Sequence, residues 1–374
     1  MDEQMNEDRM SKEKREEIED KLGKINEKKQ RELFQPIIEF NKPPTEIKDY
    51  LDKYVISQEE GKKVMATAIS FHYKRIGNAL KKELDENGGH IDAALKKTKT
   101  PKANIMLLGP SGCGKTYTSE VASDMVGVPF VKEDMTKFSE TGYVGQDIRD
   151  ILINLLIQAD GNPYMAQIGI VYLDEIDKIA GRAVVGRDVS GTGVQNGLLK
   201  VVEGIENNLD FGNQKVQLST KHVLFVASGA YEDLDIIVKN RLTRQKADYD
   251  GDWQKHVLTD DFVAYGMERQ LIGRFPVRVS YNQLDNNDLK EIMINTEDSP
   301  LMAYFEDFRA WDINLKVSDD ALDEVAKCAE REGTGARGLI GILNRVLLEH
   351  MFSMPGKYTG KLEIDKEYTI RRLK

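Results

Sequence analysis

The stretch from Ile105 to Thr116 limits the possible folds of this chain more than any other. Four apolar residues lead directly into Gly-Pro-Ser-Gly-Cys-Gly-Lys-Thr, which fits the pattern G-x-x-x-x-G-K-[ST]. We interpret it as a buried strand followed by a phosphate loop, because glycines let backbone N–H groups approach phosphate closely. Residues 117–126 contain no proline or glycine, which predicts a helix whose N-terminus points at the phosphates. A plain strand-to-helix connection is the alternative.

The same loop predicts which side chains would bind a nucleotide. We expect Lys115 to place a positive charge at the phosphates and the Thr116 hydroxyl to bind Mg²⁺. The other candidate nucleotide-binding residues of this stretch are Ser111, Gly112, Cys113, Gly114 and Tyr117.

A second apolar strand, expected at 168–173, ends in the carboxylates Asp174 and Glu175. A buried parallel strand presents its C-terminal end to a ligand. We therefore predict that Asp174 holds Mg²⁺ through water and that Glu175 orients and polarises the attacking water. The alternative is an acidic strand end that caps the next helix. A phosphate loop about sixty residues upstream favours the catalytic interpretation.

The order of strands and helices predicts an α/β fold with a parallel sheet covered by helices on both faces. The phosphate loop is then expected at the carboxyl edge of the sheet. Further strands are expected at 128–131 and 222–227, and helices at 147–158 and 194–203. From Leu284 the pattern becomes mainly helical, and residues 361–373 alternate like a strand.

We divide the chain into an N-terminal arm (1–40), a large domain (41–282) and a small C-terminal domain (283–374). The arm is rich in charged residues and is expected to be a solvated helix or disordered. Consecutive prolines at 43–44 mark the next boundary. Residues 59–80 then predict a long helix, and the polar, lysine-rich residues 81–102 predict a surface loop.

Composition restricts the functional classes further. No apolar run reaches the ~18 residues needed to span a bilayer, and the N-terminus lacks a signal-peptide pattern, so we expect a soluble cytoplasmic protein with no membrane partner. Two cysteines are too few for a structural zinc site. A net charge of −10 argues against a large sequence-independent affinity for nucleic acid, although a local basic groove could escape this average.

Taken in order, the motifs resemble the ClpX/HslU group of AAA+ protein unfoldases, from about Pro43 to the C-terminus. The resemblance rests on the phosphate loop and on four further stretches, Leu173–Lys178, Gly142–Gly145, Ile272–Pro276 and Gly335–Leu339. It implies an AAA+ ATPase fold and a homo-oligomeric ring, expected to be a hexamer. ATP, with Mg²⁺, would bind between neighbouring subunits.

The resemblance also implies roles for single residues. Arg274 would be an arginine finger that reaches the γ-phosphate of the adjacent subunit, and Arg337 would be a second sensor that contacts nucleotide from its own small domain. Val55 and Ile56 match the segment that packs on adenine, and Ser228 lies near the first sensor. For both arginines, an ordinary surface or salt-bridged residue is the alternative.

Substrate contacts are implied in two loops. Tyr143 and Val144, flanked by glycines, match the pore loop that grips polypeptide, because an aromatic on a glycine-hinged loop grips without reading sequence. Arg187 lies in a glycine-rich stretch that resembles a second pore loop. A buried turn tyrosine is the alternative for Tyr143.

Three departures from the family pattern leave the partner peptidase open. ClpX-type chains carry an N-terminal cysteine-rich zinc domain, whereas the first forty residues here contain no cysteine. Residues 242–258 contain no Ile-Gly-Phe, the tripeptide with which ClpX docks on its peptidase. HslU would carry a long insertion before the second motif, and here the connection is short.

We therefore predict an ATP-dependent protein unfoldase that translocates polypeptide through a central pore. The main alternative is an AAA+ motor acting on nucleic acid, which the tyrosine between glycines and the acidic balance disfavour. A non-catalytic scaffold would need a defect in the hydrolytic residues, and none is visible.

Overall fold

The computed structural model describes residues 27–87, 90–99, 101–138, 147–181, 191–211, 214–246 and 251–373. Contacts divide the chain into two compact units. The larger unit contains the described residues up to Ile47 together with Val64–Leu108 and Ser119–Ser280. The smaller unit contains Lys48–Lys63, Gly109–Thr118 and the described residues from Tyr281 onward. Each has its own hydrophobic core.

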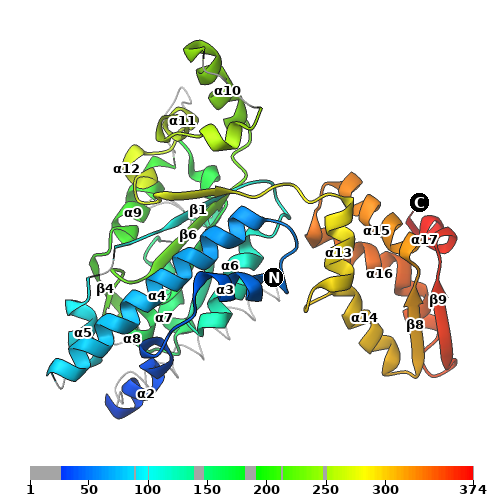
Figure 1. Ribbon diagram of the computed structural model, residues 1–374, viewed down its shortest axis with the longest axis horizontal. Coiled ribbons are helices and arrows are strands. Elements are labelled where there is room, and N and C mark those ends of the chain that lie inside the picture. Colours follow the sequence, from blue (N-terminus) through cyan, green and yellow to red (C-terminus); the bar gives the residue numbers. More distant parts are fainter. Residues whose placement is uncertain are drawn as a thin grey trace. The chain divides into compact units, whose positions relative to one another are not determined.

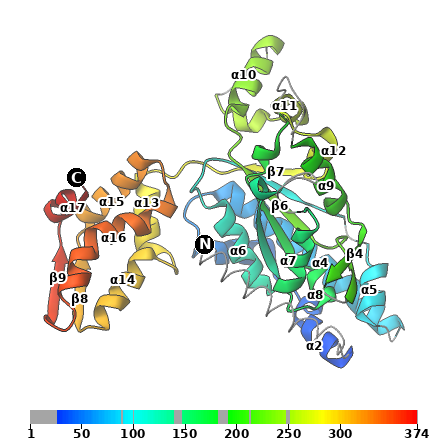
Figure 2. The same ribbon diagram turned by 180° about the vertical axis from the view of Figure 1, so that it is seen from behind.

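A five-stranded sheet with the order β2-β3-β6-β1-β7 forms the centre of the larger unit. Its strands are β1 (Ile105–Leu108), β2 (Phe130–Asp134), β3 (Ile170–Asp174), β6 (Leu224–Gly229) and β7 (Val277–Ser280). All neighbouring strands pair in parallel. Figures 1 and 2 show helices in front of this sheet from both sides. Every residue of β1 and β6 is buried, as expected for strands covered on both faces. The predicted parallel α/β fold is confirmed.

The helices of this part of the chain supply the rest of its core. In chain order they are α2 (Glu27–Ile38), α3 (Pro44–Asp52), α4 (Glu59–Asn87), α5 (Ile91–Lys97), α6 (Lys115–Val126), α7 (Asp150–Gln158), α8 (Pro163–Ala166), α9 (Thr192–Val202), α10 (Leu234–Gln245), α11 (Thr259–Tyr265) and α12 (Arg269–Ile272). Short 3-10 helices lie at Met135–Lys137 (η1), Ile176–Ile179 (η2) and Trp253–His256 (η3). In α7, residues at helical spacing such as Ile151 and Leu155 are buried beneath the sheet.

The surface loop predicted at 81–102 is wrong over most of its length. Helix α4 continues to Asn87, and Ile91–Lys97 forms helix α5. In α5 the residues Ile91, Ala94 and Leu95 are buried at positions i, i+3 and i+4. Three apolar residues within a lysine-rich segment are too short a pattern to distinguish a helix from a loop.

A β-hairpin between α9 and β6 was not predicted. It consists of β4 (Glu206–Phe211) and β5 (Gln214–Ser219), which pair antiparallel. Leu209, Phe211, Val216 and Leu218 are buried while their neighbours are more exposed, so the strands do have a period of two. The signal was present in this alternation and in the intervening sequence Gly-Asn, a dipeptide that is typical of two-residue hairpin connections.

The end of the charged N-terminal stretch is a packed helix. Residues 1–26 lie outside the described residues, and α2 follows them. Phe34, Ile37 and Phe40 are buried, and Gln30 Oε1 accepts a hydrogen bond of 2.9 Å from Asn162 Nδ2. Phe34 and Ile37 of α2 thus pack inward, while Arg31 and Glu32 of the same helix are exposed.

The smaller unit is mainly helical beyond residue 281. It contains α13 (Asn286–Asn295), α14 (Pro300–Arg309), α15 (Asp319–Glu332), α16 (Ala336–Ser353) and α17 (Lys366–Leu373), with the parallel pair β8 (Ile313–Val317) and β9 (Gly360–Ile364). The strand-like pattern predicted at 361–373 holds only to Ile364. Asp365 then accepts a hydrogen bond from Tyr368 N at 2.8 Å and starts α17.

Among the helices in the described part of the chain, none combines the length and apolar character needed to cross a membrane.

Candidate nucleotide-binding and hydrolysis site

The phosphate loop lies in the smaller unit, directly after β1. Gly112 and Gly114 have φ of +75° and +93°, values that only glycine adopts at little cost. A Cβ on Gly112 would also collide with the Thr334 carbonyl oxygen. The Gly112 carbonyl accepts a hydrogen bond of 3.1 Å from Ala336 N, so the loop contacts the start of α16. The glycine pattern therefore reflects both turn geometry and close packing.

Lys115 is the first residue of α6, and its side chain contacts the backbone of this loop. Its Nζ donates hydrogen bonds to the carbonyl oxygens of Gly109 at 2.7 Å and Pro110 at 2.6 Å. Burial raises the pKa of the neighbouring Cys113 thiol, which donates to the Pro110 carbonyl at 3.0 Å. Cys113 thus packs inside the loop as a neutral thiol.

Arg337, the predicted second sensor, contacts the phosphate loop within the smaller unit. It lies in the first turn of α16, and its Nη1 is 3.4 Å from the Ser111 hydroxyl. The two residues are 226 positions apart in the sequence. The packing of α16 against Gly112 is what brings them together.

The segment predicted to pack on adenine is fixed to the same loop by a residue that sequence analysis missed. Gln58 is buried, and its Nε2 donates to the Asn282 carbonyl at 2.8 Å and to the Cys113 carbonyl at 3.3 Å. Its Oε1 accepts from Asn282 N at 2.9 Å. Val55 is buried and Ile56 half-buried just before it. A glutamine in a short turn carries no signal for contacts this distant in sequence.

Asp174 and Ser228 meet at the carboxyl edge of the sheet in the larger unit. The Ser228 hydroxyl donates to Asp174 Oδ1 at 2.8 Å, and Lys132 Nζ lies 3.2 Å from Oδ2. Glu175 follows with an exposed side chain and a left-handed backbone, φ +55°. Such a conformation is costly for a non-glycine residue and turns the chain sharply after β3.

β1 ends at the same edge as β3 and β6, because these neighbouring strands are parallel. Leu108, the last residue of β1, thus lies at the edge of the sheet that carries Asp174. The hydroxyl of Thr116 and the carboxylate of Asp174 are hard oxygen donors, which Mg²⁺ prefers. The donor chemistry therefore fits the predicted cation.

Asp177 is a second residue that sequence analysis did not select. Its side chain is buried, and Oδ2 accepts from Tyr231 N at 3.2 Å. Burial raises the pKa of this carboxyl. Asp177 thereby fixes η2, which follows Glu175, to the segment that follows β6.

Arg274 lies at the opposite, amino edge of the sheet. Its carbonyl accepts from Asn104 Nδ2 at 2.9 Å, and Asn104 directly precedes β1. Its Nη2 forms an ion pair of 2.5 Å with Glu203. At about 3.3 Å per strand residue, β1 and β6 separate this edge from Asp174 by more than about 10 Å. The structure does not bring Arg274 to the Asp174 of its own chain.

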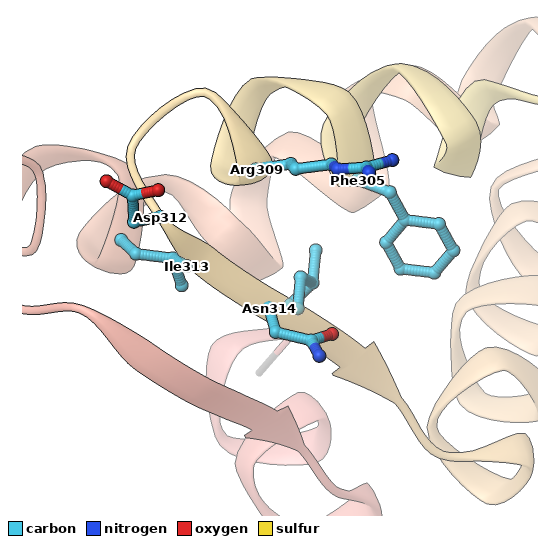
Figure 3. A pocket seen from close by; sticks show the side chains of 6 residues that line it. Phe305, Arg309, Asp312, Ile313 and Asn314 are labelled. Carbon is cyan, nitrogen blue, oxygen red and sulfur yellow. The ribbon is translucent and has the colours of Figure 1, made fainter.

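Three predicted residues, Tyr143, Val144 and Arg187, lie outside the described residues. A separate cavity of about 470 Å³ in the smaller unit contains none of the predicted nucleotide contacts. Figure 3 shows Arg309, Asp312 and Asn314 among the residues around it.

Sequence comparisons show which known proteins this chain resembles. A sequence model of the AAA domain (Cdc48 subfamily) matches residues 100–278, and a model of the C-terminal, D2-small domain of ClpB protein matches residues 284–366. The ATP-binding subunit ClpX of the ATP-dependent Clp protease from Borrelia duttonii is 36% identical over 347 residues, which is 87% of this chain and 78% of the relative. The same subunit from Borrelia recurrentis matches to the same extent.

The subunit of that name from Treponema denticola is 35% identical over 346 residues, covering 87% of this chain and 80% of the relative. Each of these matches covers more than four fifths of this chain at an identity above 30%. The chain therefore belongs to the ClpX family of AAA+ ATPases.

Proposed function

We propose that this ATPase unfolds polypeptides and draws them through the pore of a ring, hydrolysing ATP between neighbouring subunits. The proposal rests on the positions of Arg274 and Asp174 in the sheet. Arg274 and Asp174 lie at opposite edges of one sheet, so an arginine that serves hydrolysis must serve the site of another subunit. A ring is the closed arrangement in which the amino edge of every subunit, with Arg274, can face the carboxyl edge of a neighbour, with Asp174.

Within one subunit, the phosphate loop holds the nucleotide. The loop amides and Lys115 bind the phosphates, and Val55 and Ile56 pack on the base. Thr116 and Asp174 would hold Mg²⁺, which neutralises phosphate charge when bound. Ser228 orients Asp174 through its hydrogen bond.

Glu175 polarises the attacking water in this proposal. Its side chain is exposed at the carboxyl edge, where it can accept a proton from water. Arg337 contacts the nucleotide from the smaller unit, and Arg274 of a neighbour stabilises the charge of the transition state.

Polypeptide is the substrate that the sequence favours. Tyr143 and Val144, between glycines, would grip it, and Arg187 would make a second contact. The relatives are named as subunits of a Clp protease, which makes a Clp-type peptidase the partner to test. Both cysteines are free and buried, which fits the reducing cytoplasm.

Steady-state ATPase rates test this function. The rate is measured for the full chain alone, with an unfolded polypeptide and with single- or double-stranded DNA. We expect stimulation by polypeptide that is lost in Tyr143→Ala and kept in Tyr358→Ala, an exposed control tyrosine. Stimulation by DNA and indifference to polypeptide would establish the nucleic-acid motor instead.

A further inference from the structure

Glu203 contacts the side chain of Arg274 in a way that leaves part of the guanidinium available. The ion pair joins Glu203 Oε1 to Arg274 Nη2 at 2.5 Å. The two side chains are 35% and 49% exposed. Within the described ranges, no protein partner is found for Arg274 Nε or Nη1, so these donors can meet a phosphate while Nη2 is held.

The backbone of Arg274 is fixed independently of its side chain. Asn104 Nδ2 donates to the Arg274 carbonyl at 2.9 Å, and Asn104 Oδ1 accepts from Phe225 N at 3.2 Å. One buried amide therefore ties the segment before β7 to the core between β1 and β6. With the main chain fixed, Glu203 decides where the guanidinium points.

Glu203 is itself held, because it caps the C-terminus of α9. Lys102 Nζ donates to the Val202 carbonyl at 2.7 Å, and the Thr220 hydroxyl donates to the Val201 carbonyl at 2.7 Å. Burial lowers the pKa of Lys102 to about 7, and its Nζ lies 4.9 Å from the centroid of the Phe225 ring. A side-chain donor at a helix C-terminus satisfies one of its free carbonyls. The end of α9 is thus firmly attached.

The other end of α9 is attached to the segment that follows Glu175. Gln195 is 1% exposed, and its Nε2 donates to the carbonyl oxygens of Ile179 at 2.9 Å and Gly266 at 3.2 Å. Its Oε1 accepts from Glu268 N at 2.7 Å. Ile179 ends η2, and Glu268 directly precedes α12 and the Arg274 segment.

We propose that α9 positions the arginine finger. In this proposal Glu203 is the positioning residue that orients Arg274. Gln195 is the contact that fixes the helix to the segment that follows Glu175. This rests on the proposed role of Arg274. An ion pair this exposed contributes little to folding stability. The contribution of Glu203 should therefore appear in the rate of hydrolysis and not in the stability of the fold.

The test uses Glu203→Gln, which keeps the side-chain length and removes the charge. We expect kcat for ATP to fall on the order of tenfold, because a misdirected guanidinium loses its approach to the phosphate. The KM for ATP, the affinity for a fluorescent ADP analogue and the midpoint of thermal unfolding should stay unchanged. Glu206→Gln, an equal charge change three residues on, is the matched control and should leave kcat unchanged.

A double-mutant cycle with Arg274→Ala distinguishes positioning from a separate effect. Arg274→Ala should lose roughly a thousandfold or more of the rate. In a radiometric assay, adding Glu203→Gln to it should lower the residual rate no further, because Glu203 acts only through Arg274.

The failures are distinguishable. Normal hydrolysis by Arg274→Ala would overturn the proposed finger itself. If Arg274→Ala hydrolyses ATP slowly but Glu203→Gln keeps a normal rate, only the role of α9 would be overturned. The same would follow if the losses of rate in the two variants added up in the double variant.

Discussion

The hydroxyl of Ser228 donates a 2.8 Å hydrogen bond to Oδ1 of Asp174, which joins the ends of two neighbouring parallel strands. The remaining oxygen of Asp174 lies 3.2 Å from Lys132 Nζ. The carboxylate proposed to hold the cation is thus oriented from both sides. Its direction depends on β6 and β2 as much as on its own strand.

Removing the serine hydroxyl tests this orientation. In Ser228→Ala we expect the ATPase rate to fall about tenfold, since Asp174 can then rotate away from its binding direction. The Mg²⁺ concentration that gives half-maximal rate should rise. Ser123→Ala, a buried serine that donates to the Glu120 carbonyl, is the control and should leave both values unchanged. A normal Mg²⁺ dependence in Ser228→Ala would contradict the orienting role.

Gln58 offers a prediction about nucleotide binding. Gln58→Ala removes its hydrogen bonds to Asn282 and Cys113, and leaves the buried Cys113 carbonyl and the partly buried Asn282 backbone without these partners. We expect the free energy of unfolding to fall by about 1–3 kcal/mol, and ATP to bind more weakly because the base-packing segment loosens. Denaturant unfolding and nucleotide titration measure the two effects. Gln35→Ala, at an exposed glutamine, is the control and should change neither stability nor ATP affinity. Unchanged ATP affinity in Gln58→Ala would contradict a role of Gln58 in nucleotide binding.

Two buried histidines predict a loss of stability in acid. His72 Nε2 lies 2.9 Å from the His222 carbonyl oxygen, and His222 Nε2 lies 2.9 Å from that of Leu95. Burial lowers the pKa of each imidazole to about 4. In the unfolded chain each histidine has a pKa near 6.5. Between about pH 4 and pH 6.5 the unfolded chain therefore binds more protons than the folded chain. Their contribution is complete above about pH 6.5 and is lost as the pH falls towards 4.

Urea unfolding at pH 7.5 and pH 5 measures this effect. We expect the free energy of unfolding to fall by about 1 kcal/mol per pH unit for each histidine below pH 6. His222→Gln should flatten the dependence, while substitution of the exposed His90 should not. An equal slope in His222→Gln and the unsubstituted protein would contradict the assignment.

The sequence was most informative where a local pattern carried the structure. β1, β3 and β6 are apolar runs that end in glycines or carboxylates, so their presence followed from adjacent residues. Their parallel pairing followed from the alternation of strands and helices along the chain. The hairpin β4–β5 and helix α5 were missed because their apolar residues are few and interspersed with polar ones. Pattern length decides which elements can be predicted.

The residues of the site also differ in how far a local pattern predicts them. Lys115 and Thr116 follow from one motif, whereas Gln58, Asp177 and Glu203 act through partners 55, 54 and 71 positions away. Such contacts depend on strand order and helix packing, which no local pattern contains. The edge on which Arg274 lies likewise follows from the pairing of β7 with β1. The pore-loop roles of Tyr143, Val144 and Arg187 stay predictions.

The most direct test of the central claim, that each active site takes its arginine from a neighbouring subunit, is complementation between two inactive variants. Glu175→Gln and Arg274→Ala are each expected to hydrolyse ATP at least about a hundredfold more slowly than the unsubstituted protein. When both are co-expressed with different tags and isolated together, an Arg274→Ala subunit beside a Glu175→Gln subunit regains one complete site. We expect a clear recovery of ATPase activity in the mixed assemblies. Mixed assemblies as inactive as either variant alone would contradict the sharing of the arginine between subunits.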